Sequence, residues 1–312
     1  MDGSSMVVNP GLVVASNKAI IQAQRAIQLA SLFTTDFSSE LKAENEYVSV
    51  DVYSGNASTF NSTSNVYENT DGKIIPVKVG LTDVIKATFK ISQVDLNQID
   101  KSSKYRNCGV AAGRMIGDAL EKKISDLLTY TDREDAISSF TLAAMGEKIL
   151  EKIAAKYNPS TCNIVLTPKF YGALLDEAKD KGVLNGTNFA DVAQALGRLY
   201  GVKAIFMLSK VSDLSASNTH KCAGYVVPED AIVIAARGIE EAVEGMYQSF
   251  TTETDPDSGL PVTSFIHGAP GKNTAFLNSA SQIGVKLTKE SHTIDGVSTP
   301  NGAPGYLQLV TA

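Results

Sequence analysis

The chain has 312 residues, which is enough for two domains of ordinary size or for one body with a large inserted lobe. Hydrophobic residues make up 43% of it and charged residues 20%, a composition that excludes global disorder. The formal charge of -6 excludes a surface that neutralises many phosphates, so any contact with nucleic acid is expected to be weak.

Two features predict synthesis in the cytoplasm without export. Cys108, Cys162 and Cys222 are an odd number, lie far apart and form no CxxC pair, which favours a reducing compartment. The sequence has no run of about 18 to 20 apolar residues, and its first residues do not combine a basic segment, an apolar stretch and a cleavage site. We therefore expect neither a membrane partner nor secretion.

The first part of the chain predicts an arm that leads into a helix. Residues 1–11 are small and turn-forming, and such a segment is expected to lie against another surface. Between Asn17 and Leu32 the apolar residues recur at helical spacing with polar residues between them, which predicts a short amphipathic helix.

A protruding hairpin is predicted next. Tyr47 to Tyr53 alternates, with valines on one face, as in a half-buried strand. Ser54 to Lys73 is too rich in Ser, Asn, Thr and Gly to be buried, while Ile74 to Val79 and Ala87 to Val94 are again typical of strands. Because so long a polar connection is usually functional, we expect it to dock on a neighbouring molecule.

The longest predicted helix runs from Lys104 to Tyr130. This stretch contains no proline, and its apolar residues form one stripe at 3.6-residue spacing. At about 1.5 Å per residue it would extend about 40 Å. The small residues from Gly109 to Gly113 are expected to allow close approach of another backbone.

Strands and helices alternate from about residue 140 to residue 236, which predicts one α/β lobe. The helix starting at Pro168 is expected to end at Gly182, since proline favours the first helical position and glycine favours the end. The other elements expected here are helices at Phe140–Tyr157 and Phe189–Leu199, strands at Asn163–Thr167, Val202–Leu208 and Tyr225–Val227, and a buried strand or helix start at Ala231–Ala236.

The last part of the chain predicts antiparallel strands and then a tail. Met246–Thr252, Pro261–His267 and Ser281–Leu287 alternate like strands and are separated by Gly, Pro and Asp turn clusters. From Asp295 onward Gly, Pro, Ser and Asn prevail, so we expect a tail with little structure of its own.

The sequence predicts no catalytic, cofactor-binding or metal-binding residues. Nucleophilic catalysis most often needs a histidine base, and His220, His267 and His292 stand in no nucleophile-elbow pattern. His220 with Cys222 is the only close pair of zinc-ligand types, and two ligands alone do not make a zinc site. Asp255 and Asp257 lie in a turn cluster, where aspartate is favoured for its local hydrogen bonds.

Three sequence segments, in this order and spacing, resemble segments of one protein family. They are Ile164–Tyr171 (IVLTPKFY), Leu196–Val202 (LGRLYGV) and Gly224–Ala231 (GYVVPEDA). Together with the arm, hairpin, long helix and α/β lobe, they make the chain similar over nearly its whole length to the major capsid proteins of tailed bacteriophages, the Hong Kong 97 type.

The resemblance implies an α+β, Hong Kong 97-like fold and a structural role without enzymatic activity or cofactors. Copies of the chain would assemble through hexamers and pentamers into an icosahedral shell around double-stranded DNA, which they would contact only weakly. Scaffolding, portal and decoration proteins remain open as further partners. The implied parts are an N-terminal arm (1–44), an extended loop (45–94), a peripheral domain with a spine helix (95–135), an axial domain (136–236), returning peripheral strands (237–294) and a C-terminal tail (295–312).

The apolar and aromatic residues of the loop are the expected contacts between subunits. Three other functions stay open: an encapsulin-like nanocompartment shell, a monomeric α/β enzyme whose site has no familiar motif, and a secreted adhesion protein. The contents of the particles would distinguish an encapsulin-like shell from a phage capsid. A compact monomer with small-molecule activity would indicate an enzyme. The expected contact residues are Tyr47, Val50, Tyr53, Phe60, Tyr67, Ile75, Phe89 and Ile91.

Overall fold

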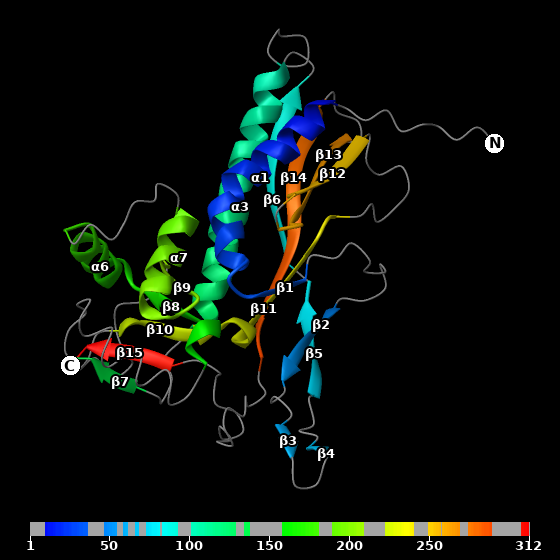
Figure 1. Cartoon of the computed structure of the whole chain (residues 1–312). Coiled ribbons are helices and arrows are strands. Elements are labelled where there is room, and N and C mark those ends of the chain that lie inside the picture. The colour runs from blue at the N-terminus through cyan, green and yellow to red at the C-terminus, as the bar shows by residue number, and fades with distance from the viewer. Residues whose placement is uncertain are drawn as a thin grey trace.

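The computed structural model has two lobes placed side by side and a narrow ribbon that projects from them (Figure 1). One lobe, here called the body, combines two long helices with a sheet, and the other is a smaller α/β lobe. The α+β class predicted from the sequence is confirmed. The structure describes residues 10–36, 47–54, 59–61, 66–68, 73–81, 83–92, 101–128, 134–137, 158–180, 189–208, 222–239, 249–256, 258–268, 274–288 and 307–311.

Helices α1 (Pro10–Ala30) and α3 (Lys101–Leu127) form the spine of the body. A Cβ atom on Gly109 would lie 2.1 Å from the carbonyl oxygen of Ala15, and one on Gly113 would lie 2.3 Å from that of Ala19. The predicted close approach of another backbone is therefore confirmed, and the order of the contacts shows that the two helices run parallel. Helix α1 begins at Pro10, earlier than the predicted Asn17, and it packs on α3 of the same chain.

The body sheet has six strands, and α1 and α3 cover one of its faces (Figure 1). The buried side chains of Ile116, Leu120 and Ile124 on α3 share one core with Ile234 and Ile283 of the sheet. The predicted antiparallel strands of the last third are confirmed. The order is β1 (Thr34–Asp36), β11 (Ile232–Arg237), β14 (Thr274–Leu287), β13 (Pro261–Gly268) and β12 (Ser249–Thr254), with β6 (Val84–Ser92) paired to β14.

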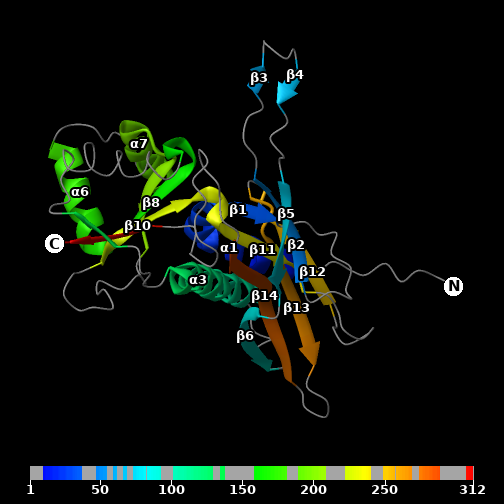
Figure 2. The same ribbon diagram turned by 90° about the horizontal axis from the view of Figure 1, so that it is seen from below.

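The α/β lobe is a five-stranded sheet with two helices on one side (Figure 2). Its strand residues divide between two cores: Ile164 and Leu166 pack with the lobe helices, whereas Val165 and Phe206 join the core of the body. Both faces of β8 are buried, so apolar residues follow one another along it rather than alternating with polar ones, and Asn163 is its one polar residue. The order is β7 (Glu134–Ile137), β15 (Leu307–Thr311), β10 (Cys222–Pro228), β8 (Cys162–Leu166) and β9 (Ala204–Met207), with helices α6 (Pro168–Asp180) and α7 (Phe189–Tyr200).

The structure departs from the sequence expectations at three places. Residues 307–311 of the expected tail form β15, which lies between β10 and β7 because the lobe sheet offers it two strands to pair with. Strand β11, expected at the end of the lobe, pairs with β14 in the body. Strand β6, expected in the hairpin, also pairs with β14. The helix expected at 140–157 lies outside the described residues.

Two short 3₁₀ turns flank the lobe segment that runs from β8 to β10. The turn η2 (Pro159–Thr161) precedes β8, and the side chain of Asn158 accepts a hydrogen bond from the backbone N–H of Ser160 there. The turn η3 (Glu229–Ala231) joins β10 of the lobe to β11 of the body. It is therefore a point at which the chain passes directly from one lobe to the other.

Candidate assembly surfaces

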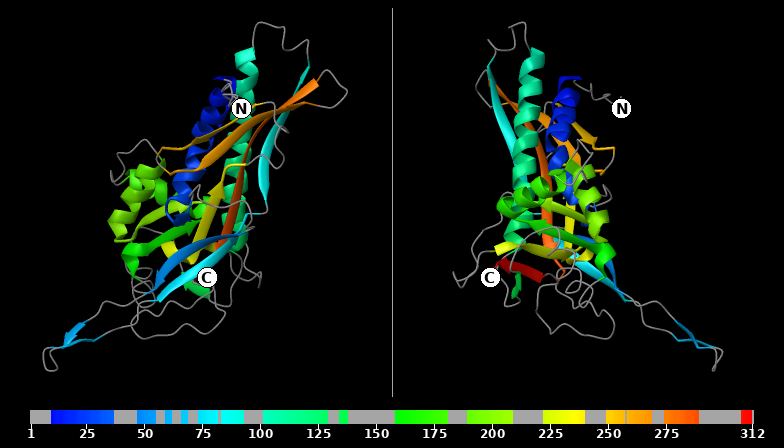
Figure 3. Two further views of the ribbon diagram at one scale, coloured as in Figure 1. Left: turned by 90° about the vertical axis from the view of Figure 1, so that its right-hand side faces the viewer. Right: turned by 60° about the vertical axis from the view of Figure 1, so that its left-hand side comes forward.

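The ribbon is built from strands that pair with each other and with no third strand in the described part of the chain. Strand β2 (Tyr47–Ser54) is antiparallel to β5 (Lys73–Gly80), and farther out β3 (Thr59–Asn61) is antiparallel to β4 (Val66–Glu68). Figure 3 shows that β3 and β4 lie well beyond both lobes. The predicted protrusion is thus present, and a small hairpin that the sequence analysis missed lies near its tip.

The strand register divides the ribbon into two chemically different faces. Val50 lies opposite Val77 and Val52 opposite Ile75, so one face carries a row of β-branched apolar residues. The alternate register positions are Tyr47, Ser49, Asp51 and Tyr53 of β2, which lie opposite Gly80, Lys78, Pro76 and Ile74 of β5. Such alternation is typical of a strand that buries one face only.

The root of the ribbon is fixed to the body. Val77, Val79 and Leu81 are buried and form a small core with Val233 and Ala235 of β11. The Nζ atom of Lys286 on β14 donates a hydrogen bond to the carbonyl oxygen of Lys78 at 2.8 Å.

β14 also approaches the root closely at a glycine. A Cβ atom on Gly284 would lie 2.2 Å from the carbonyl oxygen of Gly80, so the two backbones come very near each other there. In the register, Val52 and Ile75 continue the apolar row that begins at this buried root.

The eight predicted contact residues fall into three groups. Tyr47, Val50, Tyr53 and Ile75 are in the ribbon, whereas Phe60 and Tyr67 lie directly opposite each other in the β3–β4 hairpin. The third group, Phe89 and Ile91, belongs to β6 in the body sheet. The structure therefore brings the first six residues together on one projection and separates the last two from them.

Strand β6 has exposed apolar side chains. Phe89 is 37% exposed and Val84 is 44% exposed, on opposite faces of a strand that pairs only with β14 in the described part of the chain. Exposed apolar residues on an unpaired edge are uncommon in a monomer, because such an edge can pair with another chain.

The described residues contain no group of three His, Cys, Asp or Glu side chains that would hold a metal ion. His267 stacks on Phe276 with 5.1 Å between ring centroids, and its Nδ1 atom lies 2.9 Å from Nδ2 of Asn278. Asp255 accepts hydrogen bonds from the backbone N–H and the hydroxyl of Ser258, which confirms its expected turn role. His220, Asp257 and His292 lie outside the described residues.

Two cysteine thiols are buried and poorly ionised. Burial raises the pKa of Cys108 to about 11. For Cys162, burial and then the nearby carboxylates of Asp230 and Glu229 raise the pKa to about 12. Since the thiolate is the nucleophilic form, neither residue has the environment of a reactive cysteine. Among the described helices, none is long and apolar enough to span a membrane.

Comparison with known proteins finds similarity only at the level of structure. No protein family matches the chain, and no curated protein matches it. The solved structures similar to the chain include capsids of bacteriophages and a virus-like particle from Pyrococcus furiosus. The capsid of cyanophage P-SCSP1u is 13% identical with a TM-score of 0.46, and the comparison covers 90% of this chain and 86% of that one.

Two further capsids give comparable values. The capsid of Ralstonia phage GP4 is 12% identical, with a TM-score of 0.46 and coverage of 90% and 87% of the two chains. The capsid of a native GTA particle is 13% identical, with a TM-score of 0.47 and coverage of 92% and 90%. Because these identities and scores are low, we base the function on the geometry of this chain.

Proposed function

We propose that this chain is a major capsid protein, whose copies assemble through hexamers and pentamers into an icosahedral shell that encloses double-stranded DNA. The observation that carries the proposal is the ribbon. It is rooted in the body, it projects beyond both lobes, and its two strands form a sheet of their own (Figure 3).

A two-stranded ribbon has a physical reason to bind another molecule. An isolated pair of strands is marginally stable in water, because it buries little apolar surface. The row that begins at Val77 and Val79 is buried against β11, and the register carries this row outward to Val52 and Ile75. A neighbouring copy of the chain would cover the outer part of the row, as β11 covers the root.

The parts of the subunit correspond to roles in a shell. We assign residues 47–80 as the extended loop and α3 as the spine helix of the peripheral domain. The α/β lobe, with its sheet of β7, β15, β10, β8 and β9, is the axial domain around which copies gather. The strands β11 to β14 return to the peripheral domain. This loop is shorter than the predicted 45–94, because β6 pairs with β14.

Many modest contacts are sufficient for a stable shell. Each copy would contact several neighbours, and closure makes the later contacts intramolecular, which raises their effective concentration. The net charge of -6 suits a container, since it limits adhesion to the enclosed DNA. Scaffolding, portal and decoration proteins are additional partners within this proposal.

Purification of the chain, followed by size-exclusion chromatography and negative-stain electron microscopy, tests the proposal. Closed shells, tubes or capsomer rings are expected. A matched variant in which a Gly-Ser linker replaces residues 55–72 keeps the ribbon root and removes the tip, and it should assemble less well. A globular monomer at all concentrations, with or without the tip, would exclude the shell function. Particles filled with protein cargo instead of DNA would indicate the encapsulin-like alternative.

A further inference from the structure

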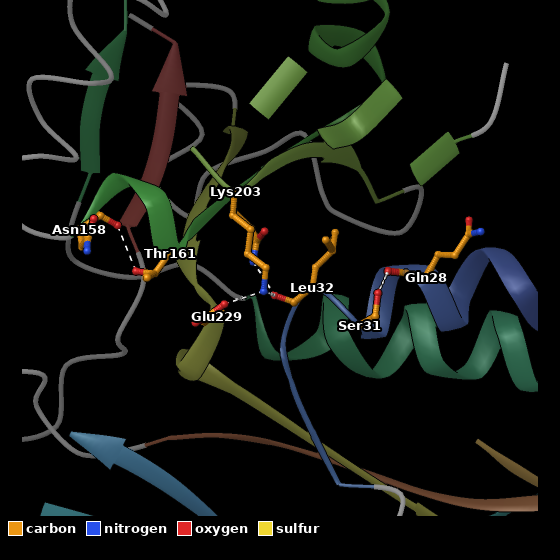
Figure 4. Close-up of polar contacts among 8 residues, drawn as sticks. Gln28, Ser31, Leu32, Asn158, Thr161, Lys203 and Glu229 are labelled. Carbon is orange, nitrogen blue, oxygen red and sulfur yellow. Dashed lines mark hydrogen bonds and ion pairs between the residues drawn. The ribbon is translucent and has the colours of Figure 1, made fainter. Parts of the chain in front are cut away.

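Lys203 joins the α/β lobe to the body through two short contacts (Figure 4). It lies immediately before β9, and its Nζ atom donates a hydrogen bond to the carbonyl oxygen of Leu32 at 3.0 Å. The same atom forms an ion pair with Oε2 of Glu229 at 2.5 Å. Leu32 belongs to the segment that connects α1 to β1, whereas Glu229 belongs to η3, so one ammonium group contacts two separate parts of the chain besides its own segment.

A second donor reaches the same carbonyl group. The side-chain Nδ2 atom of Asn163, on β8, donates a hydrogen bond to the oxygen of Leu32 at 2.9 Å. Asn163 is fully buried, and next to Leu32 the ring of Phe33 packs edge-on against Phe206 of β9 with 6.1 Å between centroids. The end of α1 is thus held to the lobe sheet by directional polar contacts as well as by apolar packing.

The junction between the lobe and the body also includes the turn η3, through which the chain passes from β10 to β11. The backbone N–H of Thr288, at the end of β14, donates a hydrogen bond to the carbonyl oxygen of Ala231 at 3.0 Å. The hydroxyl of Thr288 donates to the carbonyl oxygen of Asp230 at 2.6 Å. Glu229 is therefore attached to a turn that is itself fastened to the body sheet.

We infer that Lys203, Asn163, Glu229 and the carbonyl group of Leu32 form a polar clamp that sets the angle between the α/β lobe and the body. Apolar packing is not directional, so it permits the lobe to rotate by small amounts, whereas hydrogen bonds hold three defined positions together.

The clamp is suited to opening and closing. The side chains of Lys203 and Glu229 are 30% and 40% exposed, so water and salt weaken their ion pair and it can open at little cost. Asn163, by contrast, is buried and keeps the end of α1 attached while the ion pair is open.

The role of the clamp in a shell rests on the proposed function. Copies of one sequence that occupy both hexamers and pentamers need slightly different angles between their lobes. Because the ion pair of the clamp is partly exposed, opening it costs little free energy, so contacts with neighbouring copies can shift the lobe to a second angle.

Hydrogen–deuterium exchange of the Lys203→Met variant tests the clamp. Methionine keeps most of the aliphatic length of lysine and removes both polar contacts. We expect amide exchange around Thr288 and in the segment from Ala30 to Thr34 to accelerate by about fivefold, while the core of β8 keeps its protection. Lys90→Met is the matched control, because Lys90 is exposed on β6 and lies opposite Phe276, twelve residues before Thr288 along the chain.

The same experiment can overturn the inference. Unchanged exchange at the junction of a folded Lys203→Met variant would exclude the clamp, and so would equal acceleration throughout the lobe, which indicates general destabilisation. Should this variant fail to fold, Glu229→Gln removes the ion pair alone and is expected to accelerate the same amides by a smaller factor.

The exchange measurement does not depend on assembly. Failure of the wild-type chain to form particles would therefore reject the shell function and leave the clamp result standing. When particles form, electron cryomicroscopy should show a wider range of lobe angles in Lys203→Met particles than in wild-type particles.

Discussion

The lobe strand β8 and the ribbon strand β2 both contain several β-branched residues, but they differ in the strands that pair with them and in the elements that cover them. β8 has a strand on each side, α6 and α7 over one face and the body over the other. β2 has a single partner strand in the described part of the chain. Among the described residues, the lobe strand is therefore enclosed by its own chain, whereas the ribbon strand is paired on one side, and under the proposed function a neighbouring copy would cover it.

Loss of packing in the α/β lobe, where β8 is buried on both faces, should have the largest effect on the stability of the chain. Leu166 on β8 is fully buried, so Leu166→Ala removes apolar contacts and leaves a cavity. We expect the free energy of unfolding to fall by about 2 to 5 kcal/mol. Chemical denaturation followed by circular dichroism measures it, and a change below about 1 kcal/mol would contradict the two-faced burial of this strand.

Two glycine substitutions distinguish close helix packing from an open helix surface. Gly113→Ala would place a Cβ atom 2.3 Å from the carbonyl oxygen of Ala19, so α1 and α3 must separate. The expected loss of unfolding free energy is about 1 to 3 kcal/mol. Gly172 on α6 has no atom within 4 Å of such a Cβ, and Gly172→Ala should stabilise by about 0.5 to 1 kcal/mol through helix propensity. Thermal melts of the two variants should therefore shift in opposite directions.

Substitution on the outer ribbon should leave the subunit stable and impair assembly. Val52→Asp places a charge in the apolar row, so the free energy of unfolding should change by less than about 0.5 kcal/mol. Each contact between subunits should lose about 2 kcal/mol, which raises the concentration needed for assembly about thirtyfold. Light scattering against concentration measures this. Asn17→Asp, on an exposed turn of α1, adds the same charge elsewhere and should assemble normally.

The smallest effect concerns the buried thiols. With pKa values of about 11 for Cys108 and about 12 for Cys162, less than about one thiol in a hundred is ionised at pH 8 in the folded chain. Iodoacetamide at pH 8 should modify both residues slowly in the native protein and rapidly in urea, as mass spectrometry can show. Rapid native modification would mean that the body or the lobe opens more readily than its packing indicates.

Local patterns in the sequence predicted the individual elements well. The valine alternation predicted β2, the apolar stripe predicted the long helix α3, and Gly109 to Gly113 predicted a close backbone contact that proved to be with α1. Six of the eight predicted contact residues lie on the ribbon and its tip. They could be located from the sequence because side-chain period and polarity are properties of a few consecutive residues.

Contacts between segments that are distant in the sequence could not be predicted before the fold was known. The fold paired β6 with β14, placed β15 inside the lobe sheet, and brought Lys203 to Leu32 and Glu229. Strand partners and polar contacts of this kind depend on where the whole chain packs, because a backbone edge or a lysine forms the same bond with any acceptor that the fold presents. Local periodicity therefore accounts for the elements and for the alternation of the ribbon, whereas packing over long range accounts for the two sheets and their junction.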